Sequence, residues 1–210
     1  MREISWKQGV SRREFLGLAA AGAGVTLLAG CGGGGSGDSG SSGGGGQGSN
    51  YNITLIPGVV GDEFYISMKC GAQAEAKKLG ANLKFQGPQQ FDPSQQTPIL
   101  NAAIQSKPDA ILIAPTDKTA MIGPIQSAVN QGIPVFTVDT FIAKDIALAN
   151  VASDNIKGGM LAAAALAEGI GKKGKVLCVN VKPGISTTDQ RQQGFEKGLK
   201  KYPGIKYLGT

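Results

Sequence analysis

Histidine is absent from the sequence, and cysteine and aromatic residues are scarce. The 210 residues include three cysteines and one tryptophan, and aromatic residues make up 6% of the chain. Without histidine the chain cannot form a serine–histidine–aspartate triad, and it lacks the commonest general base and metal ligand of proteins. No CxxC pair or comparable spacing of metal ligands occurs. These absences exclude histidine-dependent hydrolysis, and we expect neither a metal site nor a bound cofactor.

The net charge of +6 is unevenly distributed along the chain. Residues 50–156 carry seven basic and nine acidic side chains, whereas residues 157–210 carry ten basic and three acidic ones. Nine of those ten are lysine, and the arginine that nucleic-acid surfaces favour occurs there once. We therefore interpret the basic excess as a solvated helical face and expect no nucleic-acid partner.

The first thirty residues are similar to the signal peptide of an exported lipoprotein. Two adjacent arginines in residues 11–16 (SRREFL) precede an uncharged stretch, residues 15–30, that ends at a cysteine. The arginine pair resembles a twin-arginine export signal, and residues 28–31 (LAGC) resemble a lipobox that is cleaved before a lipidated cysteine. A membrane-spanning helix is the alternative, but the stretch is shorter than the ~20 apolar residues that a span requires. We expect residues 1–30 to be a signal peptide and Cys31 to carry lipid.

A glycine-rich segment follows the expected lipidation site. Between Gly32 and Ser49, eleven of eighteen residues are glycine and most of the others are serine, a composition that cannot form a core. As a flexible coil this segment would have a root-mean-square span of roughly 23 Å. We expect residues 31–49 to be a linker that holds the folded part beside a membrane. The expected location is the outer side of the cytoplasmic membrane or the periplasm.

The two remaining cysteines, Cys70 and Cys178, are expected to be buried free thiols. The first falls in a helical pattern and the second in an apolar strand pattern. A disulfide formed in an oxidising compartment is the alternative. The two positions fall in different expected domains, which favours free thiols that pack as small apolar side chains.

From residue 50 onward, short β-rich runs alternate with helical patterns. Tyr65, Met68, Ala72 and Ala76, for example, recur at three- and four-residue spacing, which predicts a helix. Such alternation predicts an α/β fold, with a parallel sheet that helices cover on both faces. The wholly apolar run 110–114 predicts a strand buried on both faces. The expected strands are 52–56, 82–86, 110–114, 134–138, 147–152, 176–181 and 206–208, and the expected helices are 62–79, 93–106, 119–131, 155–171 and 187–202.

Polar and aromatic residues follow several of the expected strands. Residues 61–65 (GDEFY) follow the first strand, residues 115–117 (PTD) the third, and Asp139 and Thr140 the fourth. Ligands of parallel α/β sheets bind beyond the carboxyl ends of the strands. The sequence therefore predicts a ligand site formed by these residues.

Five motifs in this part of the chain stand in a characteristic order and spacing. Together they resemble the ribose-type periplasmic sugar-binding proteins of ABC importers, and the resemblance extends over about residues 51–210. It implies a periplasmic-binding-protein-like fold of two similar α/β lobes joined by hinge segments, with a monosaccharide bound in the cleft between them. The motifs are GDEFY at 61–65, AILIAPTD at 110–117, PVFTVD at 134–139, VASDNIKGG at 151–159 and RQQGF at 191–195.

The same resemblance implies the limits of the lobes. The first lobe would cover residues 50–154, with residues 152–154 at a hinge crossing, and the second lobe would begin at residue 155. Members of the family continue well beyond the position that matches Thr210. We therefore expect a C-terminally truncated chain, in which the first lobe is nearly complete and the second lobe, residues 155–210, has only begun.

The chemistry of a sugar suits four residues that match the family pattern. Carboxylates and guanidinium groups can bind neighbouring hydroxyls, and aromatic rings cover the C–H faces of the sugar. Asp139 matches the family's hydroxyl-binding aspartate, and Arg191 matches the arginine of the second lobe. Phe64 and Tyr65 match the paired aromatic residues that sandwich the sugar, and we expect at least one to reach the cleft. The alternatives are a turn or capping aspartate, a surface cation, and a ring that packs in the core.

Asp62 and Thr140 depart from the pattern of ribose binders. Those proteins usually carry asparagine at the first position and arginine at the second. A carboxylate lacks the donors of an amide, and threonine cannot make the two-pronged contact of arginine. We include both residues in the expected ligand site, with helix capping as the alternative role of Asp62. The sequence leaves four kinds of ligand open: a pentose other than ribose, a hexose, a polyol such as inositol, and another small polyhydroxylated molecule.

The function predicted from these residues is solute capture without catalysis. We expect the lobes to close on a sugar or polyol and the closed protein to deliver it to an ABC import permease. An exported nucleotide-dependent oxidoreductase on a Rossmann-like fold is an alternative, but residues 57–62 (PGVVGD) lack the GxGxxG pattern. A transcription regulator would need a DNA-binding head. A sugar-sensing lipoprotein that serves a membrane receptor fits the same sequence.

Overall fold

The structure, a computed structural model, describes residues 50–210. The expected signal peptide, the lipidation site at Cys31 and the linker lie outside the described residues. Within the part that is described, no helix has the length and apolar character needed to cross a membrane.

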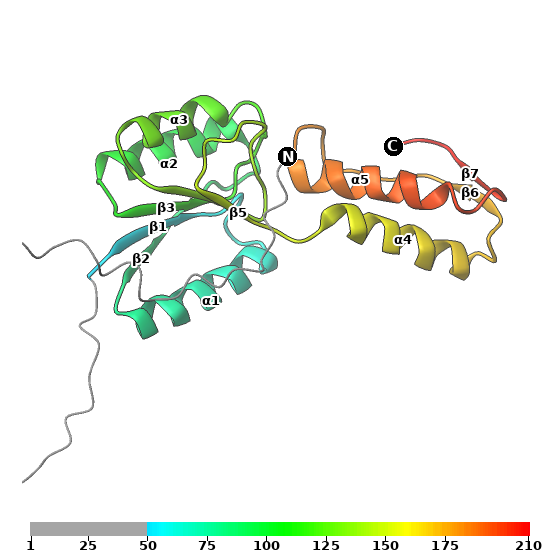
Figure 1. The fold of residues 1–210 in the computed structure, drawn as a ribbon, viewed down its shortest axis with the longest axis horizontal. Helices are drawn as coiled ribbons and strands as arrows, with labels where there is room; N and C mark the ends of the chain where they lie inside the picture. Colours follow the sequence, from blue (N-terminus) through cyan, green and yellow to red (C-terminus); the bar gives the residue numbers. More distant parts are fainter. Residues whose placement is uncertain (1–49) are drawn as a thin grey trace, which may run out of the picture. The chain divides into compact units, whose positions relative to one another are not determined.

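The first part of the fold is a five-stranded parallel sheet with helices on both faces. The strands stand in the order β2-β1-β3-β4-β5, and every neighbouring pair is parallel. Helix α1 covers one face, and α2 and α3 cover the other (Figure 1). The predicted parallel sheet is confirmed. Its elements are β1 (Asn52–Ile56), α1 (Glu63–Leu79), β2 (Asn82–Phe85), α2 (Pro93–Gln105), β3 (Ala110–Ile113), α3 (Ile122–Asn130), β4 (Val135–Val138) and β5 (Ala149–Val151).

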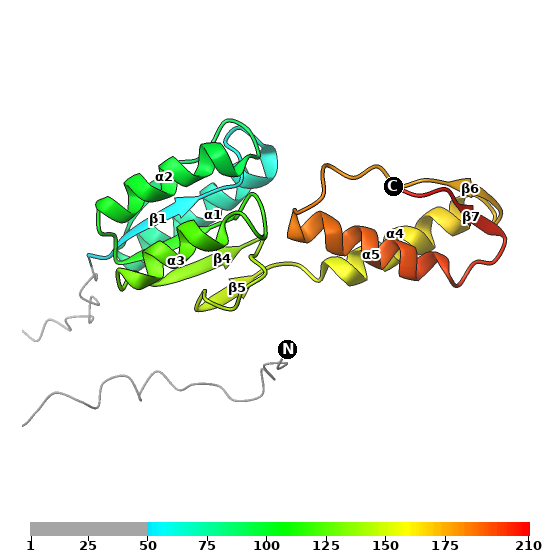
Figure 2. The same cartoon turned by 90° about the horizontal axis from the view of Figure 1, so that it is seen from above.

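The second part of the fold is a pair of packed helices with a short two-stranded parallel ladder. Figure 2 shows α4 and α5 side by side. Their close approach depends on glycine, because a Cβ atom on Gly159 would collide with the backbone of Arg191, and one on Gly194 would collide with the backbone of Ile156. The elements are α4 (Asn155–Gly169), β6 (Gly174–Val176), α5 (Ser186–Leu199) and β7 (Ile205–Tyr207).

The main core lies between the five-stranded sheet and helices α2 and α3. Ile111 and Ile113 of β3 and Leu100 of α2 are completely buried in it. Burial of such side chains contributes about 1.5–3 kcal/mol each. Helix α1 buries one residue on the other face, Tyr65. The remaining buried members of the core are Ile56, Ala103, Ile104, Met121, Ile125, Ala128, Ile133, Val135 and Ile142.

Three expectations from the sequence are wrong in detail. Strand β3 is not fully buried on both faces, because Ala110 and Leu112 remain partly exposed on the side of α1. The expected strand 176–181 is instead β6 at Gly174–Val176, and the apolar residues after it are exposed, with Val179 at 87%. Among the described residues, the backbone bond that continues the ladder there runs from the N–H of Cys178 to the carbonyl of Gly209, at 3.0 Å. Cys70 is free but exposed rather than buried, and Cys178 is free and partly exposed.

Candidate ligand-binding site

Two residues from the ends of different strands meet at the carboxyl edge of the sheet. Asp139 directly follows β4, and Tyr65 stands in the first turn of α1, which follows β1. The Tyr65 hydroxyl donates a hydrogen bond of 2.8 Å to Oδ2 of Asp139. Because all five strands are parallel, residues 74 positions apart in the sequence are joined at one edge.

The backbone of Asp139 is held in the left-handed region. Its φ is 60°, which is uncommon for a residue with a side chain. Its N–H donates to the carbonyl of Val151 at 2.8 Å, and this bond ties the turn to the end of β5. Backbone conformations of this kind cost free energy and cluster at functional sites. Asp139 caps none of the described helices, and its backbone conformation places it in a turn after β4, so the turn alternative remains compatible with its position.

The electrostatic setting of Asp139 is that of a half-buried carboxylate. Burial raises its pKa, the hydrogen bond from Tyr65 and the charge of Arg191 lower it, and the charge of Asp62 raises it. The balance is a pKa above the ordinary value for aspartate. The pKa of Tyr65 is also raised, first by burial and then by the charge of Asp139. The tyrosine thus keeps its proton and remains the donor of the pair.

The two aromatic residues of the motif face different surroundings. Tyr65 is 4% exposed, whereas Phe64 is 54% exposed. Their rings pack edge to face, with centroids 5.2 Å apart and planes at 81°. Phe64 thus presents an accessible ring next to the carboxyl edge of the sheet, and the ring of Tyr65 packs in the interior.

Asp62 caps helix α1. Its Oδ1 accepts a hydrogen bond of 2.9 Å from the N–H of Phe64, and its backbone is extended, as is typical of a cap. The capping role considered from the sequence is confirmed. Asp62 also lies close enough to Asp139 for its charge to raise the pKa of Asp139. Its position is therefore compatible with helix capping and with a place in the ligand site.

Thr140 lies next to Asp139 and is 1% exposed. Its Oγ1 is buried and has no hydrogen-bond partner among the described residues. A buried hydroxyl without a partner is unfavourable, and in natural proteins such an atom usually meets a ligand or water. The Nε2 atom of Gln86, at the carboxyl end of β2, is in the same situation. The edge of the sheet therefore holds unused hydrogen-bonding capacity at Thr140, next to Asp139, and at Gln86, with β1 and β3 between the two strand ends.

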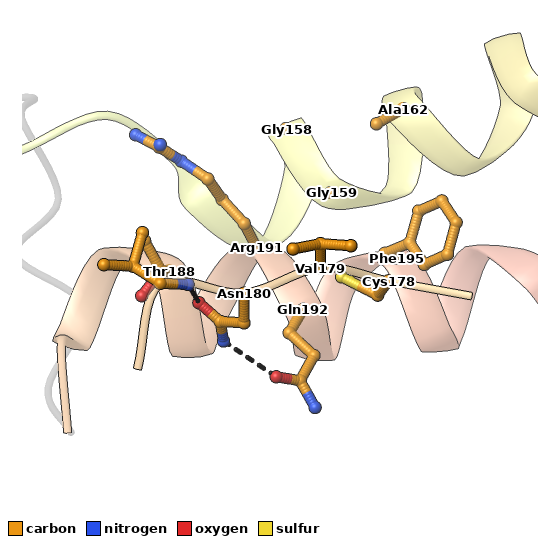
Figure 3. A pocket seen from close by; sticks show the side chains of 11 residues that line it. Gly158, Gly159, Ala162, Cys178, Val179, Asn180, Thr188, Arg191, Gln192 and Phe195 are labelled. Atoms are coloured by element: carbon orange, nitrogen blue, oxygen red, sulfur yellow. Dashed lines mark hydrogen bonds between the residues drawn. The ribbon is translucent and has the colours of Figure 1, made fainter. Parts of the chain in front are cut away.

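Arg191 lies on α5 with its side chain directed toward the start of α4 (Figure 3). Its Nε donates a hydrogen bond of 2.8 Å to Oδ1 of Asn155, which is itself buried and donates from Nδ2 to the carbonyl of Ser153 at 3.0 Å. The terminal guanidinium nitrogens remain for other acceptors. Arg191 lines a cavity of about 360 Å³ with Gly158, Gly159 and Phe195, and neither Asp139 nor Tyr65 lines this cavity.

Two supporting residues were missed from the sequence. Asn155 fixes Arg191, and its only signal was its place at the start of a helix after the expected hinge. Gln96 is completely buried on α2 and bridges the strand ends, with bonds to the carbonyls of Pro57 and Ala114 at 3.1 and 2.8 Å and from the N–H of Thr116 at 2.9 Å. A glutamine on the apolar face of an expected helix could have indicated this role.

Further hydrogen bonds connect the loops after β3 and β4 with the beginning of α5. Lys118 forms an ion pair with Asp189, and the N–H of Phe141 donates to Oγ of Ser186 at 2.9 Å. These residues border a second cavity of about 380 Å³. The candidate site residues therefore come from the connection between β1 and α1 with the first turn of α1, from the connection between β4 and β5, and from α5.

The arrangement suits recognition of a polar neutral molecule. It offers an ionised acceptor at Asp139, a cation at Arg191, a hydroxyl at Thr140 and an accessible ring at Phe64, which together match hydroxyl groups and C–H faces. In residues 50–210 no cluster of three or more cysteine or carboxylate side chains could hold a metal ion. The fold and the site define an α/β protein of the kind that binds solutes at the carboxyl ends of its strands.

The chain belongs to the periplasmic binding protein domain family, whose model matches residues 53–210. It is 39% identical to the ribose import binding protein of Bacillus subtilis (strain 168) over 145 residues, which are 69% of this chain and 47% of that protein. It is 31% identical to the ribose import binding protein of Escherichia coli (strain K12), covering 70% of this chain and 49% of that protein. The chain thus spans about half the length of the curated relatives it matches. The similarity is to solute-binding proteins, and an oxidoreductase does not fit it.

Solved structures agree with this assignment. An ABC transporter solute-binding protein from Agrobacterium vitis, bound with α-D-tagatopyranose, is 50% identical, with a TM-score of 0.75 over 77% of this chain and 58% of that one. A periplasmic solute-binding protein from Actinobacillus succinogenes with bound D-allose is 32% identical, with a TM-score of 0.69 over 76% of this chain and 58% of that one. The periplasmic-binding-protein-like fold predicted from the sequence is confirmed.

Proposed function

We propose that this protein captures a sugar or polyol and delivers it to an ABC import permease. The observation that carries the proposal is the Asp139 carboxylate, which follows a buried strand, has an uncommon backbone conformation and lies beside a buried hydroxyl without a partner. The relatives support a sugar as the ligand, since they are a ribose import binding protein and solute-binding proteins with bound tagatose and allose.

In this proposal each candidate site residue has a role. Asp139 and Thr140 bind hydroxyls of the ligand, Arg191 binds a hydroxyl from the side of α5, and Phe64 covers a C–H face. Asp62 caps its helix and contributes negative charge near the ligand, and Tyr65 supports Asp139. No bond of the ligand is made or broken, so the protein is not an enzyme.

The proposal extends to closure and to location. Residues 50–154 form the first lobe and residues 155–210 belong to the second, and a ligand that contacts both favours the closed form. Residues 1–30 direct export, and lipid on Cys31 with the linker of residues 31–49 keeps the protein beside the membrane and its permease.

A thermal-shift assay tests the function. The protein is expressed from its own gene and heated with D-ribose, D-tagatose, D-allose, inositol or a nicotinamide nucleotide. A ligand at a hundred times its Kd stabilises the folded state by about 2.7 kcal/mol, which is a clear shift. We expect a shift with at least one sugar or polyol and its loss in Asp139→Ala. A flat response to the three sugars and to inositol, with a shift by the nucleotide, contradicts the proposed function.

A further inference from the structure

One of the two oxygens of Asp139 already has a protein partner. Oδ2 accepts the hydrogen bond from the Tyr65 hydroxyl, at 2.8 Å. Because Tyr65 is 4% exposed, its hydroxyl cannot exchange this partner for bulk water without leaving a buried donor unpaired. The bond is therefore a lasting feature of the site.

The backbone fixes the same carboxylate from the other side. Asp139 has a φ of 60°, and its N–H is bonded to the carbonyl of Val151. With the main chain and Oδ2 both held, the direction in which Oδ1 points is set by the fold. No hydrogen bond to Oδ1 is formed by the described residues.

We propose that Tyr65 is a specificity-determining residue that positions Asp139 and directs it toward one ligand hydroxyl. Occupation of Oδ2 by Tyr65 leaves Oδ1 as the oxygen that the ligand meets. The residue at position 65 thus acts through Asp139, and the ring surface that the ligand meets belongs to Phe64. This inference rests on the proposed function.

The chemical consequence concerns neighbouring hydroxyls. A carboxylate with both oxygens free can accept hydrogen bonds from two adjacent hydroxyls, one at each oxygen. With Tyr65 bound to Oδ2, that oxygen keeps only one of its two lone-pair sites, so the second hydroxyl of such a pair gains less at Asp139 than the first. The site therefore discriminates little between ligands that keep or lack that second hydroxyl, as long as the first is present.

Monodeoxy sugars test this directly. Wild type and Tyr65→Phe are titrated calorimetrically with whichever of D-ribose, D-tagatose and D-allose binds most tightly, and with its monodeoxy derivatives. Asp139→Asn identifies the derivatives whose loss of affinity depends on the carboxylate. We expect wild type to have one monodeoxy derivative whose loss of affinity depends on the carboxylate, and Tyr65→Phe to have two. The second derivative should bind Tyr65→Phe at least tenfold more weakly than the parent sugar does. Identical affinity ratios in the two proteins overturn the inference.

A measurement without ligand tests the pairing itself. The Asp139 carboxyl carbon is followed by NMR as a function of pH in wild type, Tyr65→Phe and the control Tyr207→Phe. Tyr207 is a matched control, because its hydroxyl also donates to a carboxylate, Oε1 of Glu196 at 3.3 Å, on a different ladder. We expect the pKa of Asp139 to rise in Tyr65→Phe, which loses the donor, and to stay unchanged in the control.

The two measurements separate this inference from the proposed function. Equal Asp139 titrations in wild type and Tyr65→Phe overturn the positioning role. If both proteins bind the sugar with the same ratios of parent affinity to monodeoxy affinity, the specificity role is overturned and the proposed function stands. A wild-type protein that binds neither the three sugars nor inositol overturns the proposed function, and the specificity role with it, even where the Asp139 titrations of wild type and Tyr65→Phe differ.

Discussion

Gln96 is the residue whose removal should most weaken the edge of the sheet that carries the candidate site. Its side chain is completely buried and joins the ends of β1 and β3 through the carbonyls of Pro57 and Ala114 and the N–H of Thr116. In Gln96→Ala these three backbone groups lose their partner, and a cavity remains. Each buried polar group without a partner costs about 1–3 kcal/mol.

The expected loss is below the sum of the three costs, because water can enter the cavity and restore part of the bonding. We predict that Gln96→Ala lowers the free energy of unfolding by about 3–5 kcal/mol. The control is Gln105→Ala, an exposed glutamine on the same helix, which should change stability by less than about 0.5 kcal/mol. Both are measured by urea denaturation of the protein expressed from its own gene. A loss below about 1 kcal/mol in Gln96→Ala would refute the structural role assigned to these bonds.

Three further predictions address the helices, the charge and the arginine. Gly159→Ala places a methyl group against the backbone of Arg191 and should lower the free energy of unfolding by about 1–3 kcal/mol. In the control Gly158→Ala the methyl group meets open space, so this variant should be as stable as wild type or more stable. Equal melting temperatures of the two variants would contradict the packing of α4 on α5. Because burial raises the pKa of Asp139, the folded protein holds this proton more tightly than the unfolded chain, so the stability contributed by this group falls as pH rises between the two pKa values. Asp139→Asn should therefore unfold at a higher temperature than wild type at pH 7, by a margin that shrinks toward acid, and a lower melting temperature at pH 7 would contradict this. Asn155→Ala frees Nε of Arg191 and should weaken sugar binding about tenfold, or by about 1.4 kcal/mol, in calorimetry; unchanged affinity would show that the arginine needs no such support.

The alternation of strands and helices could be predicted because it depends on local patterns. Residues 52–56 and 93–105, for example, carry a β-rich run and a helical run bounded by turn residues, and the structure places β1 and α2 there. The end of β6 could not be predicted in this way. Residues 177–181 are as apolar as a buried strand, but whether they pair depends on a neighbour distant in the sequence.

The site was predictable as a set of positions but not as a set of contacts. The carboxyl-end rule and the family motifs indicated Asp139 and Arg191, since both criteria use position along the chain. The hydrogen bond between Tyr65 and Asp139, and that between Arg191 and Asn155, join residues 74 and 36 positions apart. Such pairs arise from the tertiary arrangement, and for this reason the sequence assigned Tyr65 to ring stacking or core packing and did not indicate its hydrogen bond to the carboxylate.

The most direct test is a crystal structure of the protein with the tightest-binding sugar. We predict a sugar hydroxyl within about 2.5–3.2 Å of Oδ1 of Asp139, with the Tyr65 hydroxyl still on Oδ2. A sugar bound away from the carboxyl ends of β1, β3 and β4, or an Asp139 side chain turned away from it, would contradict the account.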